Sequence, residues 1–201
     1  MKKIILPIIA LTLVAFGIGT SGITEEERDM ALTELERTQD YLINTLEGLT
    51  ESQLKYKPSP ESWSIAECVE HLSISEQMLG GMLTEALKTP ADPSKRDAVT
   101  LSDEDLLIMI SSRENKVKTG KAFEPSGKFD SHDETAKAFL QKRGEHIEYL
   151  KTTKDDLRNH YGQLPFATID GLQILLFISG HTERHILQME EVMAHENYPM
   201  Q

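Results

Sequence analysis

An all-α fold is the class that this sequence of 201 residues predicts. Aromatic residues make up only 6% of the chain, and the periodic stretches are rich in Leu, Ile, Met, Glu and Lys, which favour helices over strands. Apolar residues recur there in steps of three and four, the period of an amphipathic helix. The chain is about one domain long, and its 39% apolar residues are enough for a single core.

Residues 1–22 have the layout of a secretory signal peptide. Two lysines precede an uncharged apolar run over residues 4–18, and small residues follow it. The run is short for a membrane span and Pro7 interrupts it, but an uncleaved anchor stays open because no A-x-A cleavage site is present. We therefore expect an exported protein of the periplasm or cell envelope, with one folded domain over residues 23–201.

The formal net charge is −12, with Asp and Glu spread along most of the chain. Nucleic-acid binding is disfavoured because there is no basic stripe to neutralise phosphates. An acidic surface also disfavours anionic lipid, so we expect no membrane contact beyond the N-terminal segment. Cys68 is the single cysteine, which excludes a disulfide within the chain, and we expect it to fill the core.

The first two helices are predicted from caps and apolar spacing. Thr24 and Glu27 have the spacing of a capping box, and leucines in steps of three and four then place a helix at about 24–48. The linker at 57–60 holds two prolines and cannot continue a helix. A second helix is expected from Ser62 or Ser64 to about residue 87.

Three more helices follow, separated by loops that contain Pro and Gly. Ser102 is the expected cap of a short helix that ends near Lys118. Ser131 opens another capping-box pattern before a helix at about 131–152, and the last helix is expected at about 170–195. The inward face of the 131–152 helix is expected to hold Ala136, Phe139, Arg143, Ile147 and Leu150. The total is four long helices and one short helix.

The last helix carries two histidines on its inward face. Its seam runs through Ile174, Ile178, His181, His185, Gln188 and Val192. Buried polar groups must be paired or coordinated, because leaving one desolvated costs about 1–3 kcal/mol. Side chains at i and i+4 lie about 6 Å apart on one face, so His181 and His185 can offer two nitrogens to one ion. His71, on the inner side of the second helix, is the candidate third ligand.

The spacing of these histidines is explained equally well by metal binding and by buried core histidines that have ordinary hydrogen-bond partners. A zincin is disfavoured because Thr182 follows His181 where the glutamate would stand, and Glu183 should face away from the ion. A di-iron carboxylate bundle is excluded because no histidine has a glutamate three residues before it. His195 lies about 15 Å along the helix axis from His185, too far to share an ion. The histidines expected at the surface are His132, His146 and His160.

Two blocks of the sequence resemble the signatures of the DinB/YfiT-like superfamily. They are Trp63–Glu67 leading into Glu70–Leu72, and Gly180–Gln188. The stretches Phe123–Pro125 and Tyr161–Leu164 are also similar to that family. The resemblance covers about residues 24–195. It implies a four-helix bundle with a long crossover connection, a possible homodimer, and a divalent ion such as Zn²⁺ or Ni²⁺ on His71, His181 and His185.

The same resemblance leaves the reaction open, since the superfamily includes thiol-dependent S-transferases and proteins described as metal-dependent hydrolases. Both chemistries suit three protein ligands with an open coordination position. Low-molecular-weight thiols are kept mainly in the cytoplasm, so the expected export favours a hydrolase that uses metal-activated water on a small-molecule substrate. A thiol-dependent S-transferase and a non-catalytic metal-binding or interaction protein of the envelope are the alternatives.

Three residues near the histidines are candidates for supporting roles. Glu67, one turn before His71, either supports the metal site or is a solvated glutamate near a helix start. Gln188, one turn after His185, either orients a ligand or bridges helices. Trp63 is expected to pack at the entrance to the second helix. No residue is assigned as catalytic from the sequence.

Overall fold

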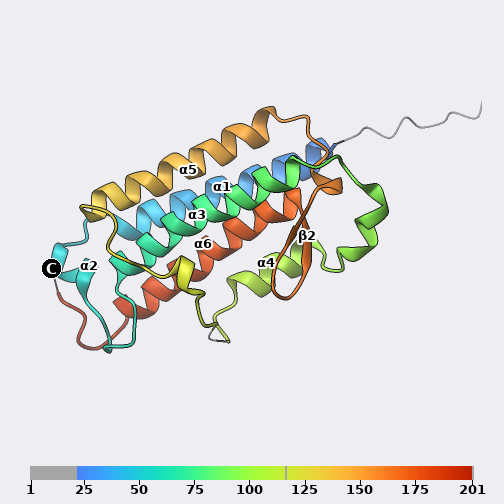
Figure 1. Ribbon diagram of the computed structural model, residues 1–201. Helices are drawn as coiled ribbons and strands as arrows, with labels where there is room; N and C mark the ends of the chain where they lie inside the picture. The colour runs from blue at the N-terminus through green and yellow to red at the C-terminus, as the bar shows by residue number, and fades with distance from the viewer. Residues whose placement is uncertain (1–21, 116, 201) are drawn as a thin grey trace, which may run out of the picture.

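In a computed structural model, residues 22–115 and 117–200 are described, and they form a bundle of four long helices (Figure 1). The long helices are α1 (Glu25–Leu46), α3 (Ile65–Leu87), α5 (His132–Thr152) and α6 (Gly171–Met193). The predicted leader lies outside the described residues, apart from Gly22. Within the described ranges, none of the helices has the length and apolar character needed to span a bilayer.

Short elements complete the chain. The helical ones are α2 (Glu51–Lys55), α4 (Asp103–Ser111) and the 3₁₀ helices η1 (Pro93–Ala98), η2 (Lys121–Phe123) and η3 (Leu157–Asn159). Two strands, β1 (Tyr161–Gln163) and β2 (Thr168–Asp170), form an antiparallel hairpin in which Gly162 lies opposite Ile169. The predicted helical class is confirmed, and this small hairpin, which the sequence did not predict, is added to it.

The helices begin where their capping residues place them. Thr24, Ser64 and Asp170 each form a capping box, in which the cap side chain accepts an N–H of the first turn and the third helical residue bonds back. Ser102 and Ser131 also cap the helices that follow them, as predicted. These contacts satisfy N–H groups that have no partner within the helix.

The predicted end of α4 is wrong by several residues. The helix stops at Ser111 instead of continuing towards Lys118, and Ser112 is already extended. The residues that follow bind α6 instead of extending α4. The guanidinium of Arg113 donates to Glu191 at 2.7 Å, and the carbonyl of Asn115 accepts from Arg184 at 2.6 Å. Contacts with another helix therefore replace the hydrogen bonds that a longer α4 would make.

The long helices form a closed ring of contacts in the order α1, α6, α3, α5. In Figure 1, α1 and α6 run in one direction, whereas α3 and α5 run in the other. Because α3 and α5 are parallel neighbours, the chain must return along the bundle between them. Residues 88–131 make this return and carry η1, α4 and η2. This segment, called the crossover below, confirms the long crossover connection.

A polar layer divides the core into two apolar clusters. One cluster contains Leu35 and Leu79, and the other contains Leu42 and Leu72. Between them lies Arg143, which is fully buried, as its predicted inward position requires. Its guanidinium donates to the side chains of Glu76, Thr38 and Thr182 and to the backbone carbonyl of Leu35. One side chain from α5 thus connects all four long helices.

The predicted surface positions of His146 and His160 are wrong. His146 is buried, and its Nδ1 lies 2.9 Å from the carboxylate of Glu76. His160 is also buried and donates from Nδ1 to the carbonyl of Ala86 at 3.1 Å. His132 is partly buried. His146 and His160 find polar partners on other elements, which spacing within their own segments does not reveal.

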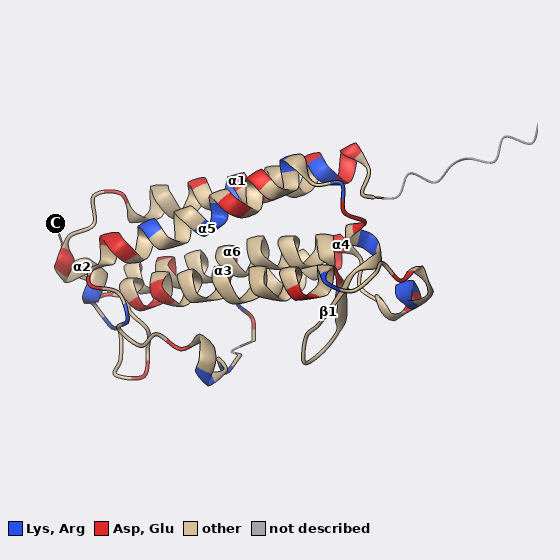
Figure 2. Ribbon diagram, turned by 45° about the horizontal axis from the view of Figure 1, so that its top comes forward, with Lys and Arg blue, Asp and Glu red and all other residues tan. Residues whose placement is uncertain are grey.

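Acidic and basic segments are interspersed over the described part of the bundle, for example along α1 and α5 (Figure 2). Arg37, for instance, pairs with both Glu34 and Glu183, and Lys151 pairs with Glu36. Most of the basic side chains of α1 and α5 therefore have an acidic partner: Arg28, Arg37, Lys142, Arg143 and Lys151.

Candidate metal centre

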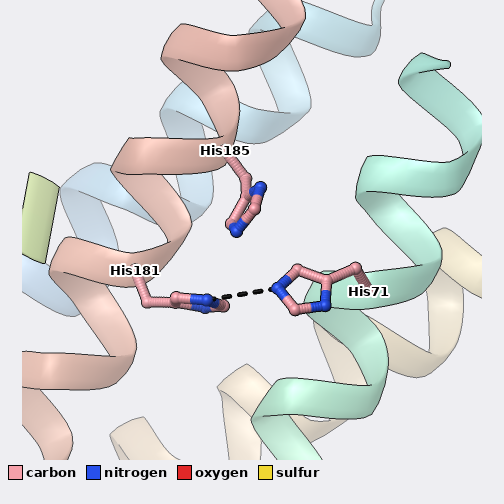
Figure 3. A group of neighbouring side chains, drawn as sticks. All are labelled: His71, His181 and His185. Carbon is pink, nitrogen blue, oxygen red and sulfur yellow. Dashed lines mark hydrogen bonds between the residues drawn. The ribbon is translucent and has the colours of Figure 1, made fainter. Parts of the chain in front are cut away.

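Three imidazoles from two helices converge on one point (Figure 3). His71 comes from α3, and His181 and His185 come from successive turns of α6. One ring nitrogen from each lies within 4.8 Å of the other two, and Nε2 of His71 is 3.2 Å from Nε2 of His181. The contact between α3 and α6 therefore brings together the three histidines that the sequence singled out. Their nitrogens form a group that could hold a metal ion.

The outer nitrogens of two rings are held by hydrogen bonds. Nδ1 of His71 donates to the carbonyl of Phe123 in η2 at 2.7 Å, and Nδ1 of His185 donates to Oε1 of Gln188 at 3.0 Å. A neutral imidazole that donates from Nδ1 has its lone pair on Nε2. Both rings therefore present an unprotonated Nε2 to the centre, which is the usual arrangement for a metal-ligating histidine.

Burial keeps all three rings neutral. It lowers the pKa of His71, and it lowers the pKa of His181 to about 3 with smaller contributions from His71 and Arg184. The pKa of His185 lies well below its usual value, first because of burial and then because of the two neighbouring imidazoles. Neutral imidazole is the form that binds a metal ion. Three such nitrogens are a donor set that fits Zn²⁺ or Ni²⁺ with a coordination position left open.

Two aromatic side chains pack against the imidazoles. The ring of Trp63 lies 4.9 Å from that of His71 and is stacked 6.0 Å from that of His185, measured between centroids. Phe177, one turn before His181, stacks on that ring at 5.9 Å. Trp63 directly precedes the cap of α3, as predicted, but its contacts with two histidines were not foreseen. Both aromatic rings restrict the orientations that the imidazoles can adopt.

The structure places Glu67 and Gln188 differently. The carboxylate of Glu67 accepts from the N–H of Ser64 at 2.8 Å and from Lys57 at 3.0 Å, so it caps α3. Gln188 holds His185 and also accepts from Arg113 at 3.3 Å. Gln188 therefore connects His185 to the segment that follows α4, whereas Glu67 has the contacts of a helix-start glutamate.

Other candidate residues lie apart from the imidazoles. Cys68 is buried in the second apolar cluster, and burial raises the pKa of its thiol to about 12, which fits core filling. Nδ1 of His195 lies 2.6 Å from the hydroxyl of Tyr56, away from the three-histidine group. The Phe123 carbonyl was missed, because a backbone acceptor carries no side-chain signal. The resemblance at Phe123–Pro125 was the one sequence feature that pointed to this segment.

Comparison with known proteins identifies the family. Residues 34–189 match the family model described as the DinB superfamily, which is more than half of the chain. The chain belongs to the DinB superfamily. The matched range contains all three histidines, Trp63 and Gln188. The resemblance read from the two sequence blocks is therefore confirmed at the level of the family.

One curated protein and one solved structure are similar to this DinB-superfamily chain. The uncharacterized protein YuaE of Bacillus subtilis (strain 168) is 29% identical over 150 residues, covering 74% of this chain and 88% of the relative. The structure of YfiT from Bacillus subtilis has a TM-score of 0.59 at 18% identity and covers 89% of this chain and 92% of that chain. YfiT is described as a probable metal-dependent hydrolase with an unusual four-helix bundle topology. At this identity the likeness to YfiT shows the shared fold.

Proposed function

We propose that this DinB-superfamily protein is a metal-dependent hydrolase of a small-molecule substrate, with His71, His181 and His185 as the ligands of Zn²⁺ or Ni²⁺. The observation that carries the proposal is the convergence of three neutral imidazoles whose nitrogens lie within 4.8 Å of one another. A divalent ion held there would supply Lewis-acid activation of a water molecule and of a substrate oxygen.

The surrounding residues have defined tasks in this proposal. The Phe123 carbonyl and the Gln188 amide fix the tautomers of two rings, because each accepts the Nδ1 proton. Trp63 and Phe177 pack on the rings and limit their movement. Arg113 holds Gln188 in place from the crossover. A site held from several sides in this way reorganises little during a reaction.

Two considerations favour hydrolysis over thiol transfer. YfiT, which shares the fold, is described as a probable metal-dependent hydrolase. The leader expected at residues 1–22 would take the protein out of the cytoplasm into a compartment where water is abundant and low-molecular-weight thiols are scarce. Cell fractionation checks the second point, because full-length chain recovered from the cytosol would remove that support.

A substrate screen tests the proposal. Zn²⁺-loaded, chelator-stripped and His181→Ala proteins are assayed against esters, amides and pairs of a thiol with an electrophile. We expect hydrolysis of an ester or amide class that is lost on chelation and in His181→Ala and returns when Zn²⁺ is restored to the wild type. His195→Ala is the matched control, since it removes an imidazole outside the three-histidine group. Turnover that requires a thiol would contradict hydrolysis, and metal binding without any turnover would favour a non-catalytic protein.

A further inference from the structure

Glu70 lies directly before His71 on α3, and its carboxylate binds the crossover. Oε1 accepts from the backbone N–H groups of Ser126 at 2.9 Å and Lys128 at 3.1 Å, and from the Ser126 hydroxyl at 3.3 Å. Oε2 accepts from the N–H of Gly127 at 3.1 Å. Glu70 is buried at 8% exposure, so these four donors replace the water that the carboxylate loses.

Gly127 gives the crossover the turn that this arrangement needs. Its φ of +68° lies in the left-handed region, which glycine adopts without steric cost. A left-handed residue in such a turn lets successive N–H groups point to one anion. Three consecutive backbone donors, from Ser126 to Lys128, consequently meet the carboxylate of Glu70.

The same short segment carries the partner of His71. Phe123, whose carbonyl accepts the Nδ1 proton of that ring, is separated from Ser126 by two residues. Adjacent residues of α3 therefore hold two points of one stretch of the crossover. If the turn at 126–128 shifts, the Phe123 carbonyl shifts with it.

We propose that Glu70 is a positioning residue of the metal centre. It fixes the turn at 126–128, and this turn holds the Phe123 carbonyl where it accepts from Nδ1 of His71. His71 then keeps its Nε2 directed at His181. The inference rests on the proposed metal-binding function, and it adds a residue that does not itself touch the ion.

The isosteric change Glu70→Gln tests this role. The amide brings an NH₂ donor into a place where four donors already converge, so at least one hydrogen bond is lost. We expect Zn²⁺ affinity, measured by chelator competition, to fall about ten- to a hundred-fold, as for other partners of ligating residues. The Co²⁺-substituted protein should show an altered visible spectrum, and amide hydrogen exchange should rise at residues 120–128. Glu124→Gln is the matched control, because Glu124 is exposed in the same segment and loses the same charge.

Gly127→Ala probes the same turn without changing any charge. A Cβ at this position would have no heavy atom within 4 Å, so the change acts through backbone strain at positive φ. We expect a loss of Zn²⁺ affinity in the same direction as for Glu70→Gln, with cooperative unfolding retained. If Glu70→Gln does not fold, the Zn²⁺ affinity of Gly127→Ala tests the role of the turn.

The outcomes separate this inference from the function on which it rests. Wild type that binds Zn²⁺ while Glu70→Gln and Gly127→Ala bind it as tightly as Glu124→Gln would overturn the role of Glu70 and leave the metal centre standing. Wild type that binds no ion would overturn both. Reduced affinity in the two variants with unchanged binding in Glu124→Gln would support the positioning role.

Discussion

The buried carboxylate of Glu76 links the stability of this fold to pH. Burial raises the pKa of this carboxyl, but the positive charge of Arg143 and the hydrogen bond from His146 outweigh burial, so its pKa lies below the usual value. The guanidinium lies 2.5 Å from the carboxylate, and neither group is exposed to solvent. Such a pair is costly to break, because removing one partner leaves the other charged and desolvated.

Glu76→Gln should destabilise the protein at neutral pH by about 3–5 kcal/mol, because Arg143 would stay buried without an anion. A carboxyl whose pKa is lowered in the folded state stabilises the fold above its unfolded pKa of about 4.5, and this contribution is lost as the pH falls through the folded pKa. The difference between wild type and variant should therefore shrink in acid. Urea unfolding from pH 7 down to pH 3 measures this difference, and a gap independent of pH would contradict the assignment.

Sequence patterns predicted which side chains point inward better than they predicted the hydrogen-bond partners of those side chains. Seam spacing placed His181 and His185 inside, and the inward position of Arg143 was also predicted and is confirmed. The burial of His146 was not predicted, because its partner Glu76 stands on a different helix. Spacing within one helix indicates which side chains share a face, but it does not show what another helix offers them.

At the scale of elements, α3 and α5 pack closely where Gly80 meets His146. A Cβ added at Gly80 would lie 2.3 Å from Nε2 of His146, whereas nothing lies within 4 Å of a Cβ added at the next residue, Gly81. The absence of a side chain at Gly80 therefore makes room for an imidazole that is hydrogen-bonded to Glu76. At Gly81, by contrast, no neighbouring atom requires the absence of a side chain.

Gly80→Ala should destabilise the protein by about 1–3 kcal/mol, the usual cost of overpacking, because the His146 ring must move away from Glu76. Gly81→Ala is its matched partner and should stabilise α3 by up to about 1 kcal/mol, since alanine is the better helix former. The free energy of unfolding in urea, measured for both variants and the wild type, tests whether the two changes have opposite effects. Equal effects of the two changes would show that the contact between Gly80 and His146 does not limit packing.

Element boundaries were predictable where a side chain sets them. The caps at Ser64 and Asp170 fix where α3 and α6 begin, and the predicted starts agree with them. The hairpin at 161–170 could not be predicted, because strands of three residues are too short to show alternation. Its close approach to α3 instead depends on Gly162, where a Cβ would lie 2.7 Å from the sulfur of Met82.

For the whole molecule, the direction of the helices decides where the site lies. Parallel α3 and α5 force the crossover to return along the bundle, and this return brings Arg113 to Gln188 and the Phe123 carbonyl to His71. The four long helices and α4 followed from the sequence patterns, whereas α2 and the 3₁₀ helices did not, and the crossover followed from the family resemblance alone. Periodicity identifies helices but not the order in which they pack, so residues alone could not predict this arrangement.

The metal content of untagged protein tests the central claim most directly. Wild type, purified without chelators, equilibrated with a small excess of Zn²⁺ or Ni²⁺ and then freed of unbound ion, is measured by inductively coupled plasma mass spectrometry next to His181→Ala and His195→Ala. We predict about one tightly held divalent ion per wild-type and His195→Ala chain, and loss of that ion in His181→Ala, because three imidazole nitrogens form the donor set. Wild type that retains no ion, or His181→Ala that retains as much as wild type, would contradict the three-histidine metal centre.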